Sequence, residues 1–200
     1  MPRPRTVDDA AIFHAVAEVL GQEGPAKLTL GRIAKVAGLA APTLVQRFGS
    51  KLGLLRAMTK AFQGGSTQYL EQLRTQYTSP FDRAREFVLC YAGMAATPKV
   101  LVNHTLAYLQ LDIRDPVLRR HTLAAGRDNE DALAALLAEA VASGELSPRT
   151  KPKDLAQVLL RLSSGSLLAW AVHRTGTARN WLARDVDFVL APFRVAGRSG

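Results

Sequence analysis

The sequence predicts an all-α fold, with a small N-terminal helical domain followed by a larger helical domain. Apolar residues recur at helical spacing along most of the chain, and no run alternates β-branched and polar residues as a strand would. Gly and Pro interrupt this pattern at short intervals, which marks the ends of separate helices. With 200 residues, 48% of them hydrophobic, the chain is long enough to bury a core.

The first predicted helix runs from about Thr6 to Gln22. Thr6 with Asp9 three residues later has the spacing of a capping box, which places the helix start there. One apolar stripe follows at helical spacing and consists of Ile12, Ala15, Val16, Val19 and Leu20. The Gly24-Pro25 pair then ends the helix.

Two short helices are predicted between residues 29 and 48. Thr29 is placed to cap the first of them, and Gly38 stands where a left-handed residue ends a helix. Pro42 suits the first turn of the second helix, whose Leu44 and Phe48 share an inward face four residues apart. Two short helices joined by a tight turn form a helix-turn-helix, which predicts that the second helix enters the major groove of DNA.

Charge supports this hypothesis only weakly. The formal net charge of +9 and a pI near 10.2 favour a polyanionic partner. Residues 1–51 hold seven basic and four acidic side chains, so the excess is only mildly concentrated in the motif. The motif therefore supports DNA binding more strongly than the composition does.

The stretch from Lys27 to Lys51 resembles the DNA-binding motif of the TetR family. The resemblance covers about a quarter of the chain and is carried by Thr29, the run Ile33-Ala34-Lys35-Val36-Ala37-Gly38-Leu39, Phe48 and the step Ser50-Lys51. The chain departs from the family pattern at Ala40, Ala41 and Val45, where the family usually has a capping Ser, a polar or basic residue, and a Tyr that contacts phosphate. The resemblance implies a DNA-binding domain at 1–51 and a helical ligand-binding and dimerisation domain at 52–200.

We expect the exposed side of the motif to contact DNA. Gln46 and Arg47 are the candidates for base edges, and Thr43 suits either a base or a phosphate. The remaining candidates are Ala41 and Pro42 for methyl or shape contacts, and Thr29, Arg32 and Lys51 for phosphates. The alternative is that the charged residues are ordinary solvated side chains, and for Arg3 and Arg5 a basic tail is favoured over a minor-groove arm.

Behind the motif, Ser50 is placed to cap a helix that carries Leu54, Leu55, Met58 and Phe62. Further helices are predicted near 81–96, 99–111, 116–143, 152–174 and 179–195. The last two are unusually apolar, and the small run Ser163-Ser164-Gly165-Ser166 lets another helix approach closely. The resemblance implies that these two helices form a four-helix bundle in a homodimer, whereas periodicity alone also fits the core of a monomer.

The same resemblance implies that the central helices enclose a cavity for a small-molecule effector. Its candidate lining has aromatic or polar-tipped side chains on apolar helices: Phe62, Phe87, Tyr91, Met94, His104, Tyr108 and Trp170. Each of these also fits an ordinary core position. The expected effector is a small hydrophobic molecule that releases a repressor from a palindromic operator.

Other function classes find little support in the sequence. No Gly-rich phosphate loop, nucleophile elbow or His-Glu step is present, so we expect no enzyme activity, catalytic residue or cofactor. Four scattered histidines and the single Cys90 give no metal-ligand spacing. Without a signal peptide or membrane span in the sequence, a cytoplasmic protein is expected. The alternative function is a helical ligand-binding or catalytic protein whose DNA-binding module has decayed.

Overall fold

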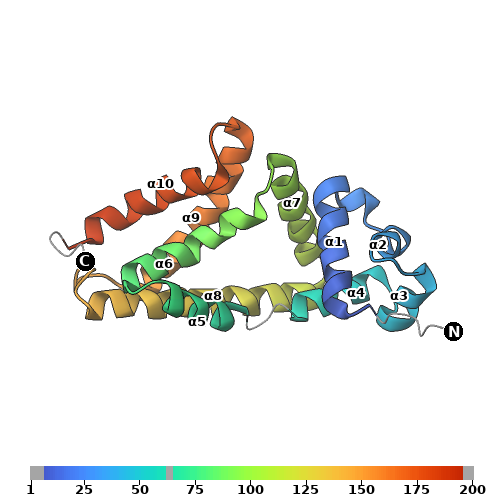
Figure 1. Cartoon of the computed structure of the whole chain (residues 1–200), viewed down its shortest axis with the longest axis horizontal. Coiled ribbons are helices and arrows are strands. Elements are labelled where there is room, and N and C mark those ends of the chain that lie inside the picture. The colour runs from blue at the N-terminus through green and yellow to red at the C-terminus, as the bar shows by residue number, and fades with distance from the viewer. Residues whose placement is uncertain (1–6, 62–64, 196–200) are drawn as a thin grey trace. The chain divides into compact units, whose positions relative to one another are not determined.

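The predicted all-α class is confirmed. The structure, a computed structural model, describes residues 7–61 and 65–195, and within these ranges every regular element is helical (Figure 1). The α-helices are α1 (Asp9–Glu23), α2 (Leu30–Val36), α3 (Ala41–Phe48), α4 (Lys51–Ala61), α5 (Gly65–Gln76), α6 (Pro80–Leu89), α7 (Pro98–Arg114), α8 (Pro116–Ala142), α9 (Pro152–His173) and α10 (Ala178–Leu190). Short 3-10 helices are η1 (Pro25–Lys27), η2 (Cys90–Met94) and η3 (Ala191–Phe193).

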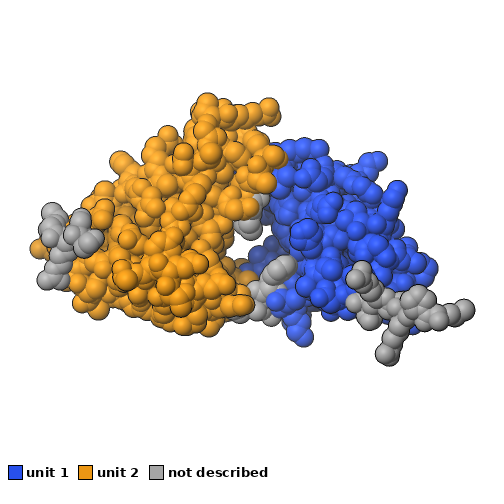
Figure 2. Space-filling model, in the orientation of Figure 1, with its two compact units in different colours: residues 1–62, 99–122 blue, residues 63–98, 123–200 orange. Residues whose placement is uncertain are grey.

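The chain divides into two compact units (Figure 2). Unit 1 comprises residues 1–62 and 99–122, and unit 2 comprises residues 63–98 and 123–200. Helix α7 and the start of α8 therefore belong with the N-terminal helices, although they follow them by some 40 residues in sequence.

Helix α1 begins two residues later than the predicted capping box would place it. The N-cap is Asp8, whose carboxylate accepts a hydrogen bond from the Ala11 amide at 2.8 Å. The predicted start at Thr6 is therefore corrected: Asp is as good a cap as Thr, and Asp8, which the sequence analysis did not select, caps the helix. Thr6 itself lies outside the described residues. The predicted apolar stripe is confirmed, since Ile12, Val16 and Leu20 are fully buried.

Helices α2 and α3 form the predicted helix-turn-helix. The Thr29 hydroxyl accepts a hydrogen bond from the Arg32 amide at 3.2 Å, and Gly38 has a φ of 69° in the turn between the helices. Pro42 lies in the first turn of α3. Leu44 is 0% exposed, and the half-buried Phe48 packs against Phe13 of α1 with ring centroids 6.3 Å apart. The inward face of α3 therefore joins the core of unit 1.

Helix α4 is joined to α3 through a close backbone approach. The Ser50 hydroxyl caps α4, as predicted, by accepting a hydrogen bond from the Gly53 amide at 3.0 Å. A Cβ atom on Gly53 would collide with the carbonyl oxygen of Phe48, the last residue of α3. Glycine at this position therefore sets the angle at which the chain leaves α3.

Helix α7 packs on the N-terminal helices through polar contacts as well as apolar ones. The Asn103 amide donates to the Gly21 carbonyl at 2.9 Å, and His104 Nε2 lies 3.2 Å from the Ala17 carbonyl oxygen. At the end of α7, the Asp115 carboxylate pairs with Arg56 of α4 at 2.5 Å and accepts from the Leu118 amide at 2.8 Å. Asp115 therefore connects α4 to the first turn of α8.

Unit 2 contains one helix that the sequence did not predict. Helix α5 buries only Leu70 and Leu73, so its apolar stripe is too thin to stand out among Thr and Gln residues. Its structure comes from tertiary contacts, because Tyr69 packs on Phe87 with ring centroids 5.8 Å apart and Arg74 pairs with Glu139 at 2.6 Å. The helix predicted at 81–96 is α6 followed by η2.

Helices α9 and α10 pack side by side in unit 2 (Figure 1). Each buries one apolar face, including Leu159 and Leu182, which are both 0% exposed. A second apolar face remains in solvent, where Val172 and Phe188 are each 80% exposed. By length and composition alone, α9 is also long and apolar enough to cross a membrane, and 44% of the qualifying window is buried inside the protein.

Candidate nucleic-acid interface

The outward face of α3 gathers most of the predicted DNA-binding residues. Pro42, Thr43 and Gln46 are exposed, Ala41 is half-buried, and neighbouring Val45 is 48% exposed. Residues four apart lie on the same side of a helix, so Ala41 and Val45 form one continuous patch beside Pro42 and Gln46. This face is made of small apolar groups with two uncharged polar side chains.

Arg47, at the end of α3, makes contacts within the protein. Its guanidinium donates to the Val7 carbonyl at 2.7 Å and pairs with the Asp9 carboxylate at 2.7 Å. It also lies over the Phe48 ring, 5.7 Å from the centroid. Arg47 thus joins the end of α3 to the first turn of α1.

Arg32, on α2, is likewise engaged. It pairs with Glu23 at the end of α1, with Nε 2.7 Å from the carboxylate oxygen. This hydrogen bond lowers the pKa of Glu23 and raises that of Arg32, since each charge stabilises the other. The two arginines that the sequence analysis assigned to DNA both hold α1 against the helix-turn-helix.

Two lysines near the motif are exposed and form no ion pair with any described residue. Lys51, at the start of α4, was expected at a phosphate from the sequence. Lys35, on the exposed side of α2, was not selected, although its place outside the stripe of Ile33 and Ala34 was a usable signal. The remaining candidate, Thr29, uses its hydroxyl as the cap of α2.

The predicted effector residues fall into both units. Phe87, Tyr91 and Trp170 belong to unit 2, whereas His104 and Tyr108 belong to unit 1. Phe62 and the Met94 side chain lie outside the described part of the structure.

In unit 2, the predicted effector residues Phe87, Tyr91 and Trp170 are buried or half-buried. Phe87 is buried beside Tyr69, and burial raises the pKa of Tyr91 to about 12, with the Asn129 side chain acting in the opposite direction. Burial also raises the pKa of the Cys90 thiol to about 11, so this thiol stays protonated at neutral pH. The Trp170 indole donates to the Gly176 carbonyl at 3.2 Å, in the turn between α9 and α10.

In unit 1, His104 and Tyr108 face neighbouring helices of the same unit. His104 lies against the Ala17 carbonyl, and the Tyr108 hydroxyl lies 4.0 Å from the Met58 sulfur. Burial raises the pKa of Tyr108. The polar tips of both residues thus have partners inside the protein.

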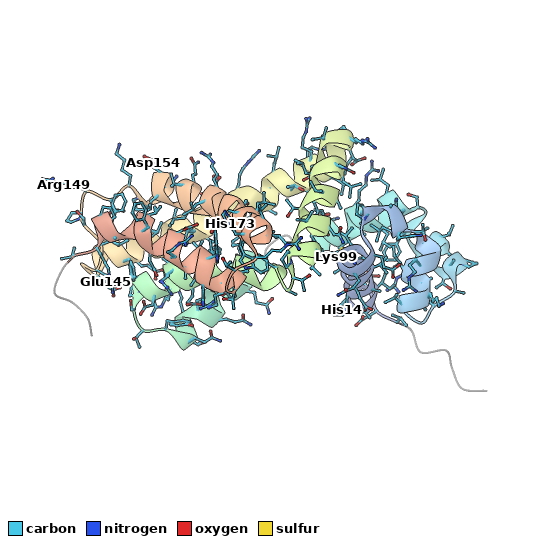
Figure 3. The ribbon with its side chains drawn as sticks, turned by 90° about the horizontal axis from the view of Figure 1, so that it is seen from above. His14, Lys99, Glu145, Arg149, Asp154 and His173 are labelled. Atoms are coloured by element: carbon cyan, nitrogen blue, oxygen red, sulfur yellow. The ribbon has the colours of Figure 1, made fainter. Side chains whose placement is uncertain are left out.

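A groove of about 420 Å³ opens in unit 2 between the start of α9 and the end of α10. Its lining is mainly apolar and consists of Arg149, Lys151, Asp154, Leu155, Val158, Val189 and Phe193. Figure 3 shows Arg149 and Asp154 at this end of unit 2. None of the predicted effector residues borders this groove.

Two family models match the chain. Residues 12–58 match the model described as bacterial regulatory proteins of the tetR family, and residues 105–186 match the model of the tetracyclin repressor-like C-terminal domain. The first match contains α2 and α3 with their flanking helices, and the second runs from α7 into α10. A comparison with curated proteins found no match.

Solved structures share this fold over nearly the whole chain. A protein from Rhodococcus sp., described as a TetR-family transcriptional regulator, is 25% identical, with a TM-score of 0.68 over 91% of this chain and 98% of that one. FadR from Thermus thermophilus, solved with lauroyl-CoA, is 22% identical, with a TM-score of 0.60 over 96% and 98%. FadR from Bacillus subtilis, solved with stearoyl-CoA, is 16% identical, with a TM-score of 0.70 over 94% and 100%.

Proposed function

Because the chain belongs to the TetR family of transcriptional regulators, we propose that it is a repressor that binds a palindromic DNA operator as a homodimer and is released by a small hydrophobic effector. The observation that carries this proposal is the exposed face of α3, held as the second helix of a helix-turn-helix by the buried Leu44. Regulators of this family are soluble DNA-binding proteins and generally not enzymes. We place the protein in the cytoplasm, where its DNA would be.

In the proposed complex, α3 lies in the major groove. Thr43 and Gln46 offer hydrogen bonds to base edges, and Ala41 and Pro42 offer apolar contact. Lys51 neutralises a phosphate, and the N-terminal turn of α2 around Thr29 lies against the backbone. Arg32 and Arg47 would reach DNA only by leaving Glu23 and Asp9, respectively.

The proposed dimer interface is the exposed face of α9 and α10. Val158, Gly165, Leu168 and Val172 recur along one side of α9, and Phe188 protrudes from α10. A row of exposed apolar side chains on one side of a helix is typical of an interaction site. Two half-sites require two recognition helices, and this face would supply the pairing.

The proposed effector site lies among the aromatic residues of unit 2. Phe87 offers an apolar ring, and Tyr91 and Trp170 combine apolar rings with polar tips; the Trp170 tip already donates to the Gly176 carbonyl. The acyl-CoA ligands of the two FadR structures support a ligand with a long apolar part. His104 and Tyr108 have partners within unit 1, so an effector would have to compete with those contacts.

Selection of bound sequences from a random duplex pool tests the DNA-binding proposal. The expected product is a palindrome, and binding should weaken steeply with salt because cationic side chains displace condensed counterions. Lys51→Ala should weaken all sequences alike, since phosphates carry no base information. A pool without enrichment, or binding that ignores both salt and Lys51, would contradict the proposal.

Thermal stabilisation by lauroyl-CoA, stearoyl-CoA and uncharged apolar compounds tests the effector proposal. A true effector should lower operator affinity by about 5- to 150-fold, and operator must weaken effector binding by the same factor. A compound that binds equally well with and without operator is not the effector. If a compound stabilises the Tyr91→Phe and Phe87→Leu variants as much as the wild type, the effector site does not include these residues.

A further inference from the structure

The DNA-facing side of α3 has no free cation. Arg47, the only charged residue of the helix, directs its guanidinium to Val7 and Asp9 at 2.7 Å each. These two bonds use one N–H on each terminal nitrogen, so a bidentate contact to guanine through that pair of nitrogens would have to replace the bonds to Val7 and Asp9. The helix is therefore poorly suited to select guanine in the usual way.

The same side of α3 is rich in exposed carbon. Val45 is 48% exposed with its two methyl groups, and Ala41 and Pro42 lie beside it, one turn toward the N-terminus. Gln46, next along the helix, provides an amide that can bond adenine at two positions. Leu44 and Phe48 point into the core, and Ala41 also packs partly against it. The part of this face that is free to meet a partner consists mainly of Pro42, Val45 and Gln46.

Thymine is the only one of the four bases with a methyl group in the major groove, at C5. Resting on the proposed DNA binding, we infer that Ala41, Pro42 and Val45 recognise the operator half-site through contact with thymine methyl groups, with Gln46 on an adjacent adenine. Arg47 is a positioning residue in this assignment: it fixes the first turn of α1 against α3 and reads no base. The exposed lysines Lys35 and Lys51 supply charge without adding base preference.

The inference is tested on the operator recovered by selection, using a second duplex in which the half-site thymines are replaced by uracil. This change removes the methyl groups and leaves the Watson–Crick pairing intact. Burying one methyl-sized group contributes about 0.8 kcal/mol of binding free energy. Each contacted methyl group that uracil lacks should therefore lower the affinity roughly fourfold. Val45→Ala should shrink the difference between the two duplexes, whereas Lys51→Ala should weaken both and keep their ratio.

Arg47 is tested by its base-preference profile. Affinities of Arg47→Ala for all single-pair variants of the half-site should fall by a common factor, with melting monitored to confirm that the variant is folded. A loss of preference at one G·C pair would overturn the positioning role and restore direct contact.

The possible outcomes distinguish a failure of DNA binding from a failure of thymine-methyl recognition. If no duplex is bound, the proposed function fails and the inference fails with it. If the palindrome is bound and the uracil duplex binds equally well, DNA binding stands and methyl recognition is overturned. Equal thymine-to-uracil ratios in wild type and Val45→Ala would also overturn it at that residue.

Discussion

Helices α3 and α9 both expose valine to solvent, and their surroundings differ. On α3, Val45 is the only large apolar side chain exposed, in a helix of eight residues with unpaired Lys51 just beyond its end. On α9, Val172 belongs to a row of exposed apolar residues along a 22-residue helix, and α10 exposes Phe188 as well. A small apolar patch near cations suits the groove of a polyanion, whereas a long apolar stripe suits another protein surface.

The largest effect is expected where a charge is placed in the stripe on α9. Gly165 is exposed, and a Cβ there would meet no atom within 4 Å, so Gly165→Arg costs the isolated protomer nothing sterically. In a dimer it would bury an unpaired charge at a cost of about 3–5 kcal/mol, more than a hundredfold in dissociation constant. Light scattering across a concentration series measures the shift toward monomer.

Gly126→Arg is the matched control for this variant. Gly126 is also a helical glycine in unit 2, exposed and with no atom within 4 Å of a Cβ. Both substitutions improve helix propensity to the same extent. If Gly126→Arg dissociates the dimer as strongly as Gly165→Arg, the interface is not specific to α9 and α10.

Next in size are two core deletions, Leu44→Ala in unit 1 and Leu182→Ala in unit 2. Both leucines are 0% exposed, and each deletion should lower the free energy of unfolding by about 2–5 kcal/mol. Leu44 anchors α3, so its deletion should affect operator binding more than dimerisation, with the reverse for Leu182. Denaturant unfolding, operator titration and light scattering on both variants check this. If both variants change operator affinity and dimerisation equally, DNA binding and dimerisation are not separated between unit 1 and unit 2.

A smaller effect is expected at two helix caps. Thr29 caps α2 and Thr177 caps α10, each accepting a hydrogen bond from the amide three residues on, at 3.2 and 3.1 Å. Replacing either with Ala should cost about 1 kcal/mol of stability. Only Thr29→Ala should also reduce operator affinity, because α2 begins at the proposed phosphate contact. Thermal melting measures the stability of both variants, and operator titration measures their affinities. If Thr29→Ala and Thr177→Ala change operator affinity equally, Thr29 is not part of the interface.

The smallest effect concerns the Arg56–Asp115 pair of unit 1. The Arg56 guanidinium and the Leu118 amide hold the pKa of Asp115 below its usual value of about 4. A lowered native pKa adds stability that is present above pH 4 and is lost as the pH falls through the native value. Wild type should therefore have a higher melting temperature than Asp115→Asn at pH 7, and the difference should shrink as the pH falls below the ordinary carboxyl pKa. If the difference in melting temperature between the two proteins stays constant with pH, the charge of Asp115 does not stabilise the contact between α4 and the start of α8.

The sequence predicted well what local patterns determine. The cap at Thr29, the left-handed Gly38, the first-turn Pro42 and the inward Leu44 all depend on residue type and spacing, and all are confirmed. The helix start at Thr6 was wrong because Asp8, two residues later, can cap a helix equally well, and residue type alone does not distinguish them.

Features that depend on contacts between residues far apart in the chain could not be predicted from the sequence. Arg47 looked like a free cation, and its partners Val7 and Asp9 lie some 40 positions away. Helix α5 has little periodicity of its own and is stabilised by residues such as Phe87 and Glu139.

The central claim is that α3 binds DNA while the α9–α10 face pairs the protomers. Its most direct test compares binding to a single half-site duplex with binding to the full palindrome. Wild type should bind the palindrome far more tightly than the half-site, because the α9–α10 face joins two copies of α3 on one DNA. Gly165→Arg should bind the half-site as wild type does and lose most of the gain on the palindrome. Titration of both proteins on both duplexes at one salt concentration measures this. Equal affinity of wild type for the half-site and the palindrome would contradict the account.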